Sequence, residues 1–225
     1  MSQPDPDTAD HWDDRYRSAP RIWSGAPNPH LVAQVDGLTP GAALDVGAGE
    51  GADAIWLAGR GWRVTGLDVS SVALDRARSH AADAGPDVAG RITWRHADVV
   101  AGDPDLGRFD LVTAQFMHLA APALASLHRR LAAAVTPGGT LLVVGHHPSD
   151  IATGVRRPRD PGMLFSAAQV AGSLAPGEWD VVVADDVERE APGPDGTPVT
   201  VRDAVLRAVR RTPEGQCGTQ RPYSP

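Results

Sequence analysis

Residues 42–58 read A-A-L-D-V-G-A-G-E-G-A-D-A-I-W-L-A, a short apolar run that ends in three glycines at alternate positions and then becomes helical. Gly47, Gly49 and Gly51 lack a Cβ, so the backbone can turn sharply there and a ligand can approach it closely. A helix that starts near Gly51 directs its free N–H groups to the same place. This strand, turn and helix predict an α/β protein that holds an adenosine-containing cofactor at the turn.

Two acidic residues beside the glycines bear on the identity of that cofactor. The glycine spacing by itself also fits the loose dinucleotide pattern G-x-G-x-x-G/A. Asp45 precedes the first glycine by two positions, and Glu50 lies between the last two glycines. Phosphates close to two carboxylates are electrostatically unfavourable, whereas an ammonium and a sulfonium are favoured there. We therefore expect S-adenosylmethionine (SAM), which carries both cations and no phosphate.

Further apolar stretches follow in a regular order and read as strands, at residues 62–68, 91–98, 109–116 and 140–145. Asp68 ends the first of these stretches and Asp98 ends the second. Together with L-D-V-G-A-G-E-G at 44–51, this order resembles the class I SAM-dependent methyltransferases over residues 31–210. An ordered set of motifs is far more specific than any one of them.

The resemblance implies a cofactor site at the ends of the first strands. In such proteins an acid in the place of Asp68 accepts hydrogen bonds from the ribose hydroxyls, and an acid in the place of Asp98 binds the adenine amino group. The cofactor-binding residues that we expect are Asp45, Gly47, Ala48, Gly49, Gly51, Asp68, Val69, Asp98, Val99, Gln115 and Tyr16. At Ala48 many relatives carry a cysteine, which is also small.

The resemblance also implies the fold, a Rossmann-like, doubly wound and mostly parallel seven-stranded sheet with a C-terminal antiparallel hairpin. The stretches 179–185 and 199–209 read as the two hairpin strands, because a turn-rich A-P-G-P-D-G-T-P joins them. Helices are predicted at 51–60, from Ser70 or Ser71 to 84, at 122–135 and at 166–174. We expect the domain organisation 1–30 as an N-terminal lid, 31–211 as the methyltransferase domain and 212–225 as a disordered tail.

Residues that follow the fourth and fifth strands should face the transferred methyl group, because ligands of such sheets bind beyond the carboxyl ends of the strands. The expected reaction is an in-line displacement that leaves S-adenosylhomocysteine, with positioning of the acceptor as the main catalytic task. The candidate catalytic residues are His118, His146 and Gln115. The candidate substrate-binding residues are Trp12, Trp23, Phe116, Met117 and His147.

Each of these candidates has a structural alternative. His118 could cap or pack at a helix entrance, and Gln115 could bind only backbone. His146 and His147 point in opposite directions if the strand continues, so at most one of them faces the methyl. Adjacent histidines lack the spacing of a zinc site, and no metal is expected.

The N-terminal aromatics Trp12, Tyr16 and Trp23 could cover the cofactor, or they could pack against the edge of the sheet. The stretch W-D-D-R-Y followed by I-W-S-G resembles the leading segment of small methyltransferases that act on thiols, halides, tellurite or thiopurines. A soft nucleophile is therefore one candidate acceptor, and an S, O or N atom remains open.

Composition limits the partners. With 21 basic and 28 acidic residues the formal net charge is −7, which disfavours nucleic acid and favours a small molecule. The fourth strand leads into Ala114–Met117 and not into the Asn/Asp-Pro-Pro-aromatic turn of enzymes that methylate amino groups in DNA. There is one cysteine, Cys217, and no long apolar run or basic, hydrophobic leader, so we expect a cytoplasmic monomer or homodimer without a membrane partner.

Two other functions compete with methyl transfer. A protein with the SAM fold can be a cyclase or a ligand sensor. An NAD(P)-dependent oxidoreductase is disfavoured by Asp45, by the terminal hairpin and by the lack of a Tyr-x-x-x-Lys pair.

Overall fold

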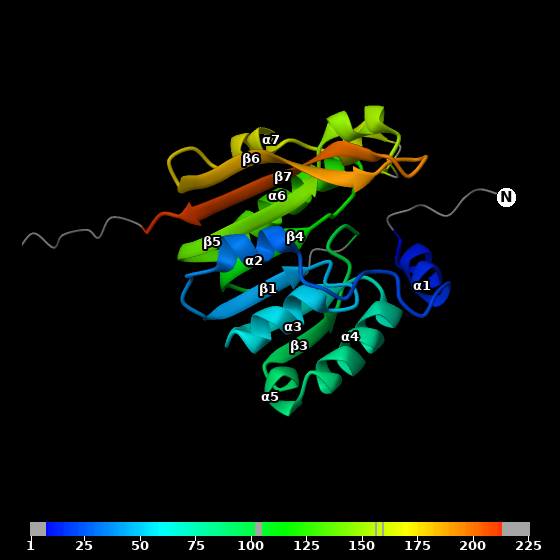
Figure 1. The fold of residues 1–225 in the computed structure, drawn as a ribbon. Helices are drawn as coiled ribbons and strands as arrows, with labels where there is room; N and C mark the ends of the chain where they lie inside the picture. The colour runs from blue at the N-terminus through cyan, green and yellow to red at the C-terminus, as the bar shows by residue number, and fades with distance from the viewer. Residues whose placement is uncertain (1–7, 102–104, 156, 159, 213–225) are drawn as a thin grey trace, which may run out of the picture.

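Seven strands form one sheet in the order β3-β2-β1-β4-β5-β7-β6 (Figure 1). The computed structural model describes residues 8–101, 105–155, 157–158 and 160–212. The strands are β1 Ala42–Val46, β2 Arg63–Asp68, β3 Ile92–His96, β4 Phe109–Gln115, β5 Val135–His146, β6 Trp179–Pro192 and β7 Pro198–Arg210. Strands β1 to β5 are parallel, and β7 is antiparallel to both β5 and β6. The predicted fold, including the C-terminal hairpin, is confirmed.

Helices cover both faces of this sheet. The helices of the described residues are α1 Ala9–Arg17, α2 Pro29–Val35, α3 Ala52–Gly59, α4 Ser71–Asp83, α5 Pro86–Ala89, α6 Ala121–Ala134 and α7 Ala167–Gly172, with 3-10 turns η1 Pro148–Thr153 and η2 Pro161–Met163. Of these, α1 packs on α4 and not on the sheet. One hydrophobic core lies against α2 and α3, and the other lies against α6 and α7 (Figure 1). Successive residues of β5 alternate between them, since Leu141 and Val143 enter the second core and Leu142 and Val144 the first. The central strands are therefore buried on both faces, which is why they read as continuous apolar runs.

Local capping fixes where two of the helices begin. The Ser70 hydroxyl accepts a hydrogen bond from the Ala73 N–H at the start of α4. At α7, Ser166 and Gln169 form a reciprocal capping box. Both helix starts agree with the prediction, because the capping residues and their partners lie within four residues of one another at the start of each helix.

Several boundaries differ from the prediction. Strand β3 ends at His96, so Asp98 lies two residues beyond the strand and does not end it. Strand β4 ends at Gln115, because Phe116 has a left-handed φ of 52° that extended backbone cannot contain. Strand β5 begins at Val135, the last residue of the helix predicted at 122–135. Its pairing with β4 contains a register shift.

A short helix, α5, begins at Pro86, within the Gly85-Pro86 pair that the sequence predicts only as the end of α4. Proline at a first helical position has no N–H to leave unsatisfied, so the same residue that stops one helix can start the next. Of the predicted C-terminal tail, 213–225 lie outside the described residues, and so does Cys217. Among the described residues, no helix is long and apolar enough to cross a membrane.

Candidate functional site

The glycine turn lies at the carboxyl end of β1, where α3 begins. Gly47, Gly49 and Gly51 have φ angles of 74°, 52° and 88°, all in the left-handed region that other residues rarely adopt. The Gly47 and Ala48 N–H groups both donate to the carbonyl oxygen of Leu67 at the end of β2. The turn is therefore tied to the neighbouring strand, and its glycines are required by conformation.

Asp68 closes the turn from the end of β2. Its carboxylate accepts hydrogen bonds from the Gly49 N–H and the Ser70 N–H, both at 2.8 Å. The side chain is buried, and burial raises the pKa of Asp68 even though the two backbone N–H groups oppose that rise. Asp68, the expected ribose-binding acid, is thus held in place by the glycine turn. The remaining lone pairs of its carboxylate can accept hydrogen bonds from ligand hydroxyls.

Asp45 lies beneath the same turn. It is 2% exposed, and its Oδ2 atom has no hydrogen-bond partner among the described residues. Burial, together with the nearby carboxylates Asp53 and Asp68, raises the pKa of Asp45 well above its usual value. Burial also raises the pKa of Asp53 to about 6. Three acids with an unsatisfied oxygen among them fit a ligand that brings a cation to this place.

Glu50 does not have the role expected from the sequence. Its carboxylate accepts hydrogen bonds from the backbone N–H groups of Ile22 and Trp23, and it pairs with Arg76 at 2.9 Å. The charge of Glu50 is therefore neutralised within the protein and does not favour a cationic cofactor. Of the two acids that the sequence places beside the glycines, only Asp45 still favours a cationic ligand.

The N-terminal aromatics lie over the glycine turn. Trp23 Nε1 donates to the Tyr16 hydroxyl at 3.0 Å, and a Cβ added to Gly49 would lie 2.8 Å from that hydroxyl oxygen. The Trp12 ring lies 6.2 Å from the Tyr16 ring, between centroids. Burial and the nearby Asp68 raise the pKa of Tyr16, so its hydroxyl keeps its proton. Figure 1 shows α1 beyond the carboxyl ends of the parallel strands, where a lid would lie.

Three further residues that are expected to bind the cofactor, Asp98, Val99 and Val69, lie near the end of β3. Asp98 Oδ1 accepts hydrogen bonds from the Val100 and Ala101 N–H groups, so this oxygen shapes its own turn. Val99 is buried, and its carbonyl oxygen accepts from Arg130. The Val69 carbonyl oxygen lies 2.9 Å from His96 Nε2. The adenine-binding role of Asp98 and the cofactor-binding roles of Val69 and Val99 remain predictions.

A second group of side chains lies in the segment after β4 and contacts the glycine turn. A Cβ added to Gly47 would lie 2.3 Å from the Met117 sulfur, so Met117 covers the glycine turn. Phe116, the one described non-glycine residue with positive φ, precedes it. Such a conformation in a bulky residue is strained and is concentrated at functional sites. The segment after β4 is therefore held in a specific conformation against the glycine turn.

Two histidines stack beside Phe116. The rings of His118 and His146 are nearly parallel, with centroids 4.9 Å apart, and Phe116 lies 4.4 Å from His146. Burial, followed by the proximity of His146 and Arg157, lowers the pKa of His118 to about 3. Its Nε2 atom is buried without a hydrogen-bond partner among the described residues. Burial also lowers the pKa of His146, against the effect of nearby Asp203. Both rings are therefore neutral at pH 7.

The other two candidates have local partners. Gln115 donates from Nε2 to the Thr113 hydroxyl, while its Oε1 atom is buried without a partner among the described residues. His147 caps η1, where its Nδ1 accepts from the Ser149 N–H, and its Nε2 lies 3.6 Å from Asp186. Strand β5 ends at His146, so the expected alternation of adjacent strand residues does not apply to His147, which begins η1. His146 lies in the group with Phe116.

No group of three or more His, Cys, Asp or Glu side chains in the described part of the chain is arranged to hold a metal ion.

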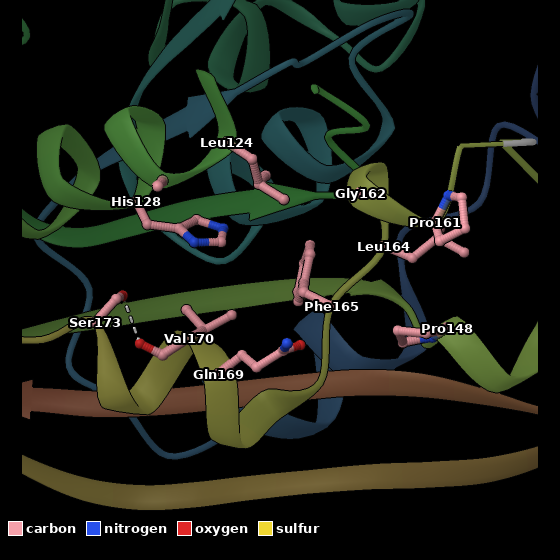
Figure 2. Close-up of a pocket in the computed structure, with 11 residues that line it drawn as sticks. Leu124, His128, Pro148, Pro161, Gly162, Leu164, Phe165, Gln169, Val170 and Ser173 are labelled. Atoms are coloured by element: carbon pink, nitrogen blue, oxygen red, sulfur yellow. Dashed lines mark hydrogen bonds between the residues drawn. The ribbon is translucent and has the colours of Figure 1, made fainter. Parts of the chain in front are cut away.

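A separate cavity of about 310 Å³ lies on the α6 and α7 side of the sheet (Figure 2). His128 and Phe165 form an edge-to-face pair there, with centroids 5.2 Å apart. Phe165 packs on Gly145, where a Cβ would lie 2.2 Å from the ring. Strand β5 therefore separates this cavity from His146, which lies on the α2 side. Pro148 and Pro161 line the end of the cavity near η1 and η2.

We expect His128 to make the stability of the protein depend on pH. Burial lowers the pKa of His128 from 6.5 to about 4. Between these two pH values the unfolded chain binds a proton at His128 and the folded chain does not. The free energy of unfolding is therefore highest above pH 6.5, and it falls as the pH is lowered toward 4. The shift corresponds to about 3 kcal/mol. Urea unfolding of wild type and His128→Leu at pH 7 and pH 4.5 measures this effect.

The loss of stability on acidification should be smaller in His128→Leu than in wild type. His96→Leu, a change at an exposed histidine, is the matched control and should keep the wild-type dependence. Equal losses in all three proteins would contradict the assignment to His128.

Two sets of ion pairs were not predicted from the sequence: Arg76 pairs with Glu50, and both His30 and Arg189 meet Asp203. Asp203 gives one local signal, because a lone acid interrupts the apolar run of β7. Arg76 and Arg189 look like ordinary polar residues of a helix and a hairpin strand, and nothing local marks their buried partners.

Comparison with known families gives a match to the methyltransferase domain over residues 43–139. Curated relatives also match part of this chain. An uncharacterized methyltransferase of Mycobacterium tuberculosis is 36% identical over 121 residues, which are 52% of this chain and 58% of that protein. The ubiquinone biosynthesis O-methyltransferase of Paracidovorax citrulli is 38% identical over 117 residues, 50% of this chain and 48% of that protein. The chain thus spans about half the length of these relatives.

Among solved structures, a chain from work on the conversion of a disulfide bond into a thioacetal group during echinomycin biosynthesis has a TM-score of 0.69. It is 25% identical and covers 90% of this chain and 91% of its own length. The likeness therefore extends over nearly the whole fold, including the hairpin that lies outside the matched domain.

Proposed function

We propose that this chain, which carries a methyltransferase domain within the class I methyltransferase fold, is an enzyme that transfers the methyl group of SAM to a small-molecule nucleophile. The observation that carries the proposal is the glycine turn with a buried, partly unsatisfied Asp45 beneath it and Asp68 beside it. The domain match at 43–139 supports it independently.

The residues of the turn fit SAM better than a dinucleotide. Asp45, with a free buried oxygen and acids close by, favours the ammonium group of the cofactor and would repel a pyrophosphate. Asp68 would accept the ribose hydroxyls, and Tyr16 and Trp23 would cover the methionine part of the cofactor. When bound, SAM supplies an electrophilic methyl group on a positively charged sulfur.

The acceptor would bind against Phe116, Met117, His118 and His146, next to the turn. Apolar Phe116 and Met117 would exclude water, and the histidines would orient the attacking atom in line with the methyl. Gln115 would assist through its free carbonyl oxygen, while Trp12 and His147 would contact the acceptor from the rim. The leaving group is neutral, so no residue needs to donate a proton to it.

The partners we propose follow from charge and fold. The net charge of −7 disfavours nucleic acid. We propose a small acceptor molecule, a cytoplasmic location and a monomer or homodimer. The ubiquinone-pathway relative, named as an O-methyltransferase, makes oxygen one of the acceptor atoms to test, beside sulfur and nitrogen.

Isothermal calorimetry with SAM, S-adenosylhomocysteine and NADH tests the cofactor. We expect both sulfur compounds to bind and NADH to give no heat. Binding of NADH with no response to either sulfur compound would refute the proposal. Radiolabelled SAM with thiols, phenols, amines and halides then tests transfer, and SAM binding without transfer to any of them would favour a sensing or cyclising function.

A further inference from the structure

Asp203, on β7, lies directly opposite His146 of β5 in the antiparallel register. Both residues are on the α2 side of the sheet, at the end where the cofactor turn lies. Asp203 is 2% exposed and thus almost completely removed from water. A carboxylate buried this deeply is costly unless its oxygens are paired.

Three side chains from three elements meet this carboxylate. Arg189 of β6 donates from Nε to Oδ2 at 2.6 Å and from its terminal nitrogen to Oδ1 at 3.3 Å. His30 of α2 donates from Nε2 to Oδ2 at 3.1 Å. His146 Nδ1 lies 3.5 Å from Oδ1. Although burial opposes it, these neighbours hold the pKa of Asp203 well below its usual range, so it is ionised.

The two nitrogens of His146 have different surroundings. Nδ1 is buried, faces Asp203 and makes no hydrogen bond at this distance. Nε2 forms no hydrogen bond to any described residue, and the side chain keeps 15% of its surface exposed. His118 stacks on one side of the ring and Phe116 lies against it as well. Contacts of catalytic histidines are often long without substrate and shorten when the ring becomes charged.

The charges around His146 are thus contributed by several elements. Asp203 faces it from β7 and Asp150 from η1, both of which stabilise a protonated ring. Arg157 opposes protonation, and so does His118 whenever it is charged. Arg189 and His30 both pair with the Asp203 carboxylate and so affect His146 through it.

We propose that Asp203 is the positioning residue that orients His146 as a general base, and that the acceptor therefore carries a proton on its attacking atom, as a hydroxyl or a thiol does. This inference rests on the proposed methyl transfer. The oxygen or sulfur lone pair forms the bond to the methyl carbon, and the carbon–sulfur bond of the cofactor breaks with its electrons going to sulfur. The acceptor proton goes to His146 Nε2, so the positive charge moves from the sulfonium to the imidazolium, which Asp203 stabilises. A halide has no proton to give and would not need this arrangement.

Asp203→Asn keeps the shape of the side chain and removes its charge. With labelled SAM and catechol or thiophenol as the probe acceptor, we expect kcat to fall about 10-fold while KM for SAM stays within twofold. Loss of the anion disfavours the protonated ring, so the acid limb of the kcat profile should move to lower pH by about one unit.

Arg189→Gln should change the pH profile in the opposite direction to Asp203→Asn, and this test does not depend on Asp203→Asn being folded. Removing this cation leaves more of the Asp203 charge for His146, so the acid limb should move to higher pH. Shifts in opposite directions are not expected from a purely structural ion pair, whose loss would only destabilise the protein. Glu188→Gln, which breaks the exposed Arg202 pair on the same hairpin, is the control and should leave the limb unmoved.

The outcomes separate the two proposals. If SAM does not bind, the proposed function fails. If methyl is transferred but neither variant moves the acid limb, or if iodide is methylated faster than catechol and thiophenol, the proposed function stands and the assignment of Asp203 is overturned.

Discussion

Asp68→Ala is expected to weaken SAM binding about 100-fold, through the loss of hydrogen bonds to a charged acceptor worth ~1.5–3 kcal/mol. Two effects combine in this change. The ribose hydroxyls lose their acceptor, and the Gly49 and Ser70 N–H groups lose the carboxylate that holds the glycine turn closed. Isothermal calorimetry with SAM measures the dissociation constant.

Asp75→Ala is the matched control for this variant. Asp75 is an exposed acid on α4, and its carboxylate pairs with Arg78 in the next turn of the helix. The control should bind SAM as wild type does. A folded Asp68→Ala protein with the wild-type dissociation constant would show that Asp68 shapes the turn without contacting the cofactor or being needed for its binding.

Arg76→Met is expected to lower the free energy of unfolding by about 3 kcal/mol, because it leaves Glu50 buried without its cation. Glu50 is 5% exposed, and Arg76 also donates to the carbonyl oxygens of Tyr16 and Ala19. The variant therefore releases the N-terminal segment from the cofactor turn as well. A fall in Tm of about 10 °C in thermal unfolding is the expected size for a chain of this length.

Arg78→Met, two positions further along α4, is the matched control. Its side chain is 48% exposed and pairs with exposed Asp75, so its removal should cost less than about 1 kcal/mol. Limited proteolysis provides a second measurement, since cleavage within residues 8–25 should become faster only in Arg76→Met. Equal falls in Tm for the two variants would contradict a stabilising role of the buried Glu50–Arg76 pair.

The parts of the site that depend on adjacent residues could be predicted from the sequence. The glycine turn is one, because left-handed backbone selects glycine at Gly47, Gly49 and Gly51. Asp68 is another, since a strand end fixes its place. The cap of α4 and the capping box of α7 are equally local.

The interpretation of Glu50 failed because its partners are distant in the chain. Ile22, Trp23 and Arg76 meet it only in the folded protein. The charge of a residue can be read from the sequence, but not whether another element neutralises it. Asp203 is similar, as its partner His30 is 173 positions away, and Asp98 was displaced because the length of β3 depends on its pairing with β2.

The contact of Glu50 with the backbone of residues 22–23 orders the segment that lies over the glycine turn. Residues 16–23 are already ordered against the glycine turn, through Glu50, Arg76 and the Tyr16–Trp23 hydrogen bond. A mobile covering segment would lose conformational entropy on each binding event and weaken affinity accordingly. Here that entropy is lost during folding, so the surface over the glycine turn is preorganised, and the Glu50–Arg76 ion pair contributes to this order.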